Sequence, residues 1–121
     1  MRTAIRIGIV IVFVLFTISL AHAQYSGHDL IKGWEASKRC NENRGTTSDY
    51  NDTFFYFGYV SAAFDIGCPF SGFCQLPAGG VTRWQIAAVV GKYLEAHPEQ
   101  WSLAASALVM LALKNGFPKS Q

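Results

Sequence analysis

A helical pattern of apolar residues is clearest between Gly79 and Trp101. Thr82 offers a side-chain oxygen as N-cap, and Gln85 stands three residues later, which is the spacing of a capping box. Pro98 ends the helix because the residue before a proline is pushed out of the α region. One face is apolar at the i, i+3, i+4, i+7 and i+8 positions: Ile86, Val89, Val90, Tyr93 and Leu94. The pattern predicts a helix here and a second apolar helix directly after it.

Two further helices are predicted earlier in the chain. The first lies between residues 24 and 43, with Ser26 as its cap and Leu30, Ile31 and Trp34 as its apolar stripe. The second begins within residues 46–49 and runs to about Ile66. Its FFYFGYV stretch also suits a strand, because aromatic residues favour strands. The small helix formers that follow it without a turn favour the helix.

The predicted second helix carries more aromatic side chains than one small core can cover. Tyr50, Phe54, Phe57 and Phe64 fall near helical spacing. Gly58 and Ala62, four residues apart, are small enough to let another helix approach closely. Some of the aromatic residues are therefore candidates for an oligomer interface.

The last helix completes an all-α domain. Residues 67–80 are rich in Gly and Pro and predict a long loop, and Pro98 suits the first turn of the last helix. Gly116 suits its C-cap position. Its predicted buried face is Trp101, Leu103, Ala104, Leu108, Leu111 and Ala112. The sequence thus predicts a small all-α domain of four to five helices.

The first residues are typical of an export signal. Arg2 and Arg6 precede an apolar run over residues 7–20, and Ala21-His22-Ala23 supplies the small residues that a signal peptidase reads. The run is shorter than the roughly 20 residues that a membrane-spanning helix needs. The sequence predicts a cleaved signal peptide, residues 1–23, with cleavage after Ala23, and a mature domain of residues 24–121.

Removing that segment changes the charge. The whole chain has 10 Lys and Arg against 8 Asp and Glu, but Arg2 and Arg6 belong to the predicted signal peptide. The mature domain is then formally neutral with His neutral. A neutral domain without a basic cluster gives no support to nucleic-acid binding.

Three cysteines cannot all pair within one molecule. An exported chain meets an oxidising compartment, so Cys40, Cys68 and Cys74 are disulfide candidates. If the first two helices are antiparallel, Cys40 and Cys68 lie at opposite ends of a helix, roughly 27 Å apart. The first choice is therefore Cys68 with Cys74, and the second is Cys40 with Cys74.

Residue types that carry catalysis are few. The mature domain has two histidines, and His97 precedes a proline at a helix end while His28 lies in a first turn. No phosphate loop or dinucleotide fingerprint is present, and the cysteine and histidine spacing does not suit a metal site. The sequence predicts a protein that is not an enzyme and that carries no cofactor and no metal.

Three motifs together resemble the Rap1a/Tai family of immunity proteins associated with bacterial type VI secretion. They are GYVSAAFD (residues 58–65), FCQLPAGGVTRWQIAAVVGKYLEAHPEQW (residues 73–101) and AASALVMLALKNGFP (residues 104–118). The combination of GVTxxQ with KYLxxHPE is the most specific part. The resemblance implies a small helical periplasmic protein, often a homodimer, that binds and blocks a secreted peptidoglycan amidase or endopeptidase.

The chain departs from the family pattern at two cysteine positions. Family members usually carry a cysteine just before the GY motif and another after the final FP. Here those places hold Phe55, Tyr56 and Lys119. The usual partners of Cys40 and Cys74 are therefore missing, and Cys68 is the residue that could form a replacement bridge.

Two exposed segments are the candidate contact surface for the toxin, because loops on a rigid scaffold commonly carry recognition. An alternative role for Phe70, Phe73 and Leu76 is to cover the core. A second candidate function is a small periplasmic chaperone or envelope stress protein that binds clients through exposed aromatic residues. The candidate toxin-binding residues are Pro69, Phe70, Phe73, Leu76 and Pro77 in the loop and Glu95, His97, Glu99 and Gln100 at the helix junction.

Overall fold

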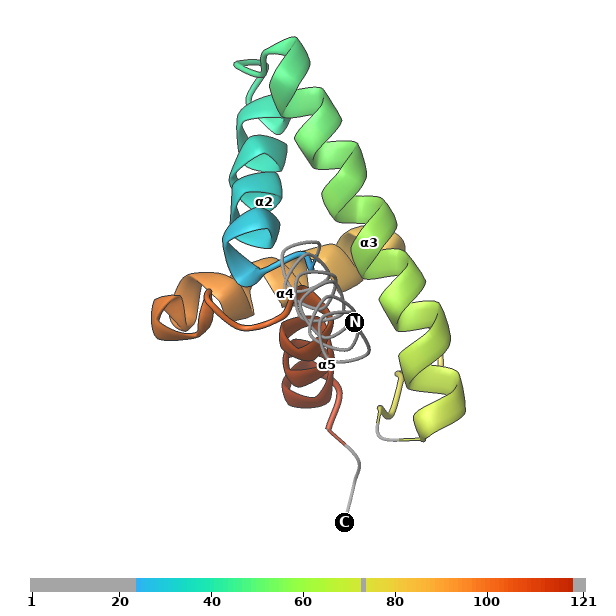
Figure 1. Ribbon diagram of the computed structural model, residues 1–121. Coiled ribbons are helices and arrows are strands. Elements are labelled where there is room, and N and C mark those ends of the chain that lie inside the picture. The colour runs from blue at the N-terminus through green and yellow to red at the C-terminus, as the bar shows by residue number, and fades with distance from the viewer. Residues whose placement is uncertain (1–23, 73, 119–121) are drawn as a thin grey trace, which may run out of the picture.

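The computed structural model describes residues 24–72 and 74–118, without the side chains of residues 69–71. Over these residues the chain forms four α-helices and a short 3-10 helix, whose arrangement is drawn in Figure 1. The predicted all-α class is confirmed. The predicted signal peptide and its cleavage site lie outside the described residues. The helices are α2 (Gly27–Asn41), α3 (Thr47–Ser71), α4 (Arg83–Ala96), η1 (Pro98–Gln100) and α5 (Ala105–Gly116).

The long helix α3 forms one side of the domain. Helix α2 lies beside its first half, and α4 crosses beneath α2 and behind α3 (Figure 1). Helix α5 lies below α4 and packs on both α4 and α3. None of the described helices is long and apolar enough to span a bilayer.

Capping boxes begin three of the four helices. In all three the side chain three residues later accepts a hydrogen bond from the N-cap N–H, and at Thr46 and Thr82 the N-cap hydroxyl also accepts from the N–H three residues later. The box predicted at Thr82 and Gln85 and the cap predicted at Ser26 are both confirmed. The three pairs are Ser26 with Asp29, Thr46 with Asp49, and Thr82 with Gln85.

Helix α3 is longer than predicted. It continues past Ile66 to Ser71, so the prediction that the loop begins at Gly67 is wrong. Cys68 explains the difference. Its side chain is 4% exposed and packs in the core, and it reaches the core because the chain is still helical at this position. The helix ends at Gly72, whose φ of 60° is a left-handed conformation that glycine adopts without a Cβ penalty.

The last helix begins later than predicted. Pro98 opens η1, not α5, and a short segment separates η1 from Ala105. That segment accepts hydrogen bonds from the start of α2: the Gly27 N–H donates to the Leu103 carbonyl and the His28 N–H to the Trp101 carbonyl, both at 3.0 Å. These two N–H groups have no partner inside α2, so the segment satisfies them.

The later start changes which side of α5 is buried. Leu108 and Ala112 are buried as predicted, but Leu103 is 44% and Leu111 43% exposed, so both were wrongly assigned to the core. The predicted C-cap is displaced by one residue, because Gly116 is the last helical residue and Phe117 the cap. Val109 and Leu113 are fully buried and complete the core face of α5.

Three helices meet at glycines. A Cβ on Gly33 of α2 would lie 2.6 Å from the Cβ of Tyr56 on α3. A Cβ on Gly91 of α4 would lie 2.2 Å from the Trp34 ring, so that ring lies directly against the α4 backbone. Tyr56 is fully buried between them, and its hydroxyl donates a hydrogen bond of 2.7 Å to the carbonyl of Ala87. Burial raises the pKa of this phenol above its ordinary value, so it stays a donor.

The aromatic residues of α3 divide between core and surface. Phe64 is 9% exposed and Phe57 partly buried, whereas Tyr50 is 47% and Phe54 73% exposed. The close helix approach predicted at Gly58 does not occur among the described helices, because nothing there lies within 4 Å of a Cβ built on it. Ala62 is exposed as well.

We predict that Gly91→Ala destabilises the domain by about 1–3 kcal/mol, because the new methyl group overlaps the Trp34 ring. Urea unfolding monitored by tryptophan fluorescence measures this change. Lys92→Ala, at an exposed site in the same helix, is the control and should stay within about 0.5 kcal/mol of the wild type. Equal stability of Gly91→Ala and the control would contradict the close contact.

A second prediction concerns Asp49, whose carboxylate accepts hydrogen bonds from Arg39 and from the Thr46 backbone and hydroxyl. The Arg39 hydrogen bond first, and then those from Thr46, hold the pKa of Asp49 below its ordinary 3.8. A lowered folded-state pKa contributes stability above about pH 4 that is lost as the pH falls further. Asp49→Asn should therefore lower the urea midpoint at neutral pH and weaken its decline below pH 4. Glu99→Gln, at an exposed site, should leave the curve unchanged.

Candidate partner-binding surfaces

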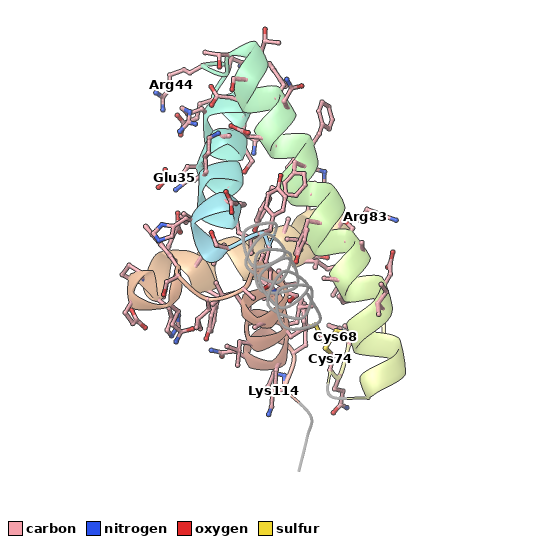
Figure 2. The ribbon with its side chains drawn as sticks, in the orientation of Figure 1. Glu35, Arg44, Cys68, Cys74, Arg83 and Lys114 are labelled. Carbon is pink, nitrogen blue, oxygen red and sulfur yellow. A yellow bond between two sulfur atoms is a disulfide. The ribbon has the colours of Figure 1, made fainter. Side chains whose placement is uncertain are left out.

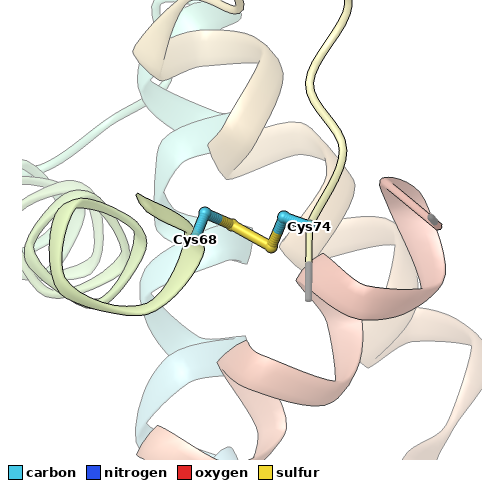
Figure 3. Close-up of a disulfide and its surroundings, with 2 residues drawn as sticks. All are labelled: Cys68 and Cys74. Carbon is cyan, nitrogen blue, oxygen red and sulfur yellow. A yellow bond between two sulfur atoms is a disulfide. The ribbon is translucent and has the colours of Figure 1, made fainter. Parts of the chain in front are cut away.

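The segment after α3 is fixed by a disulfide. Cys68 in the last turns of α3 pairs with Cys74, with the two Cα atoms 5.1 Å apart (Figure 3). The first-choice pairing is therefore confirmed, and Cys40 is left as the free thiol. Cys40 lies beside the start of α3, with its Sγ 3.7 Å from the Thr53 hydroxyl oxygen, as the antiparallel arrangement predicted.

The loop residues follow this disulfide. The N–H of Gln75 donates a hydrogen bond of 3.0 Å to the carbonyl of Phe117, which ties the loop to the end of the domain. Leu76 is 37% exposed, and Pro77 is exposed beside it. The exposure of Leu76 argues against the alternative that it covers the core. The side chains of Pro69 and Phe70, and the whole of Phe73, lie outside the description.

The junction between α4 and η1 is held by four hydrogen bonds that involve side chains. The Tyr93 hydroxyl donates to Gln100 Oε1 at 3.0 Å, and the Trp101 indole donates to the Leu94 carbonyl at 2.8 Å. His97 stacks on Tyr93 with ring centroids 4.1 Å apart, and its Nδ1 donates to the Tyr93 carbonyl at 2.8 Å. The fourth bond joins Lys38 to Glu95.

The Lys38–Glu95 ion pair connects α2 to the end of α4. The hydrogen bond from Lys38, first among its causes, lowers the pKa of the Glu95 carboxyl. Both side chains are more than a third exposed, so solvent screening makes the pair a small contributor to stability. Glu95 is thus already engaged within the domain, whereas Glu99 is exposed and forms no ion pair among the described residues.

A shallow groove of about 290 Å³ adjoins the junction. Four of its eight lining residues are small or aliphatic, and the other four have side chains with polar groups. The junction therefore combines a rigid backbone, an apolar depression and several hydrogen-bonding groups. The lining residues are Val89, Lys92, Tyr93, Ala96, His97, Ala112, Asn115 and Gly116.

The structure does not bring the two predicted segments together. In Figure 1 the junction lies at one end of α4, and the disulfide loop leads into the opposite end beside the foot of α3. Figure 2 shows Cys68 and Cys74 at that lower end of α3. Helix α4 has 14 residues, so its ends are roughly 20 Å apart. The loop and the junction are two separate surfaces.

The sequence prediction named Phe54 among its interface candidates but did not identify two other large exposed apolar side chains. Ile66 on α3 is 70% exposed and Trp84 at the start of α4 is 59% exposed. The sequence did indicate that this part of α3 is apolar, because no charged residue occurs between Thr53 and Phe64. Among the described residues, no group of three or more potential metal ligands occurs.

Comparison with known families identifies the chain. A family model described as Rap1a immunity proteins matches residues 26–118. The chain belongs to the Rap1a immunity protein family. The match begins at the N-cap of α2 and includes every described helix. Searches of curated proteins and of solved structures give no match.

Membership of the Rap1a family implies immunity against a secreted toxin, achieved by binding it. Proteins of this kind are generally not enzymes, in agreement with the sequence prediction. A binding protein needs a shaped surface with a few anchoring side chains, and no reactive groups.

We predict that reducing the disulfide lowers the free energy of unfolding by about 2 kcal/mol, because the unfolded chain regains the entropy of a small closed loop. Urea unfolding with and without a reductant measures the difference. Cys40→Ala should show the same loss, since Cys40 is outside the bridge. The finding of more than one reactive thiol in the unfolded, unreduced wild type would contradict the pairing.

Proposed function

We propose that the protein acts in the periplasm, where it binds a secreted peptidoglycan amidase or endopeptidase and blocks its active site. Membership of the Rap1a immunity family is the observation that carries the proposal. The predicted export segment, residues 1–23, supports the location, because peptidoglycan-cleaving toxins act in the same compartment. The proposal includes a homodimer as the state in which the protein acts.

We propose the junction as the part of the surface that enters the toxin. A segment that fills a cleft binds more tightly when it is ordered beforehand, because less conformational entropy is lost on binding. The junction satisfies this condition through Tyr93, His97 and Trp101, whose hydrogen bonds hold η1 against α4. Glu99 and Pro98 are exposed at its outer side and are free to contact a partner.

The disulfide loop is the second candidate surface. Leu76 and Pro77 are exposed there, and the Cys68–Cys74 bridge and the Gln75–Phe117 hydrogen bond hold the loop at its start. Because the loop and the junction lie at opposite ends of α4, a single toxin cleft accommodates one of them. Substitutions at the two surfaces therefore give different results.

The test is inhibition of purified type VI amidases and endopeptidases, measured as release of peptidoglycan fragments over a range of inhibitor concentrations. We expect Glu99→Arg to weaken inhibition at least about tenfold, equivalent to about 1.4 kcal/mol of binding free energy. Glu35→Arg, the same charge change at an exposed position of α2, is the matched control (Figure 2). Leu76→Asp should inhibit as the wild type does.

Two results would contradict these statements. Loss of inhibition with Leu76→Asp, but not with Glu99→Arg, would assign the contact to the disulfide loop. A wild-type protein that inhibits none of the hydrolases, yet prevents unrelated unfolded proteins from aggregating, would favour the chaperone function instead.

A further inference from the structure

The exposed side of α3 has an apolar row that no other helix of the described residues covers. Phe54, Gly58, Ala62 and Ile66 follow one another at intervals of four residues, which places them along one ridge of the helix. Phe54 and Ile66, at the two ends, are 73% and 70% exposed. Gly58 has nothing within 4 Å of a Cβ built on it. The row therefore has two large apolar ends and a low centre.

A groove runs beside this row. It has a volume of about 360 Å³ and lies between α3 and α5, with Tyr59, Ala62, Ala63 and Ile66 on one side and Ser106 and Met110 on the other. A second depression of about 450 Å³ shares Met110 and extends to Leu111, which is 43% exposed. Ser106 and Lys114 contribute polar side chains to these walls, and Tyr59 contributes its ring. The other lining residues are apolar.

We propose that this face binds a second copy of the same chain, with the two α3 helices antiparallel about a two-fold axis between Gly58 and Ala62. This inference assigns a surface to the homodimer that the proposed function includes. It rests on the proposed function only for the statement that the protein acts as a homodimer. The row is symmetric about the level of Val60: an antiparallel copy places Gly58 opposite Ala62 and Phe54 opposite Ile66. The Phe54 ring of each copy then lies against Ile66 of the other copy and against the groove between its α3 and α5 helices.

Helix geometry favours this pairing. When rows of four-residue spacing on two helices interdigitate, the helices cross at about −50°, which is the commonest class of helix packing. The small residues at the crossing allow the backbones to approach, and the large residues lie on either side of it. A stripe of small residues alone would not indicate a partner. Here the exposed Phe54 and the apolar groove provide the complementary shapes.

The distribution of charge favours a copy of the chain as the occupant. No charged residue occurs from Thr53 to Phe64, so the central part of the face has no charge for a charged partner to recognise. Asp65 is the nearest charged residue on this side of α3. In the antiparallel pair the two copies of Asp65 are separated by about ten residues of helix, or roughly 15 Å, so their repulsion is screened at physiological salt.

The extent of the face is consistent with a dimer. A specific interface commonly buries about 800 Å² on each partner. Phe54 and Ile66 are each about 70% exposed, Phe55 is 38% and Tyr25 42% exposed, and the two rings of Phe55 and Tyr25 are stacked 4.2 Å apart. With the walls of the two adjoining depressions, these side chains group into an exposed apolar patch, which commonly marks an interaction site.

The experiment is sedimentation equilibrium of the protein made from its full-length gene, over a concentration series. We expect the wild type to be a dimer. Ile66→Glu should raise the dimer dissociation constant at least about 30-fold, because it places a charge against the partner's Phe54 without a counter-charge. Leu103→Glu introduces the same charge at an exposed aliphatic residue outside this face and should leave the dimer unchanged.

A double variant tests the geometry. Phe54→Lys alone should also dissociate the dimer, whereas Phe54→Lys combined with Ile66→Glu should recover at least about tenfold of the lost affinity. Positions 54 and 66 of one helix are about 18 Å apart, so the new charges can pair only between two chains. Recovery in the double variant therefore reports the antiparallel arrangement itself.

The outcomes separate this inference from the proposed function. A wild type that stays monomeric up to about 1 mM, or a dimer that Ile66→Glu does not affect, would overturn the inference. A monomer whose toxin inhibition is lost with Ile66→Glu would assign the face to the toxin instead. Inhibition of a hydrolase by a monomeric wild type would leave the immunity function standing while the dimer fails.

Discussion

The close approach of three helices at two glycines is the constraint on which the rest of the structure depends. Gly33 brings α2 against Tyr56 of α3, and Gly91 brings α4 against the Trp34 ring. Because a side chain at either glycine would overlap its neighbour, these contacts fix the distances between the helices. The Tyr56 hydroxyl then reaches the Ala87 carbonyl, so the centre of the core contains a satisfied polar group as well as apolar packing.

The N-terminus of α2 extends this framework to the surface. Its first two N–H groups bond to carbonyls of the segment after η1, and the Ala105 N–H donates to the Tyr25 carbonyl at 2.7 Å. The start of the domain is thereby tied to the segment between its last two helices. The junction is held separately, by the hydrogen bonds of Tyr93, His97 and Trp101, and such order before binding is what the proposed toxin contact requires.

The arrangement of the helices gives the domain separate surfaces. The junction and the disulfide loop lie at opposite ends of α4 (Figure 1), and the exposed row is on α3. A two-fold pairing through α3 would leave both ends of α4 accessible in each copy. The proposed self-association and the proposed toxin contact therefore use different surfaces.

The sequence by itself determined the helices, the N-caps at Ser26 and Thr82, the preferred Cys68–Cys74 pair and the family, because periodicity, capping and short loops are local properties. Only the tertiary structure decided the end of α3 and the start of α5. Cys68 stays helical because it packs in the core, and residues 101–104 leave the helix because they satisfy N–H groups of α2. It also decided that Phe54 and Ile66 are exposed while Tyr56 is buried, since the helical pattern of an aromatic segment does not reveal which face has a neighbour.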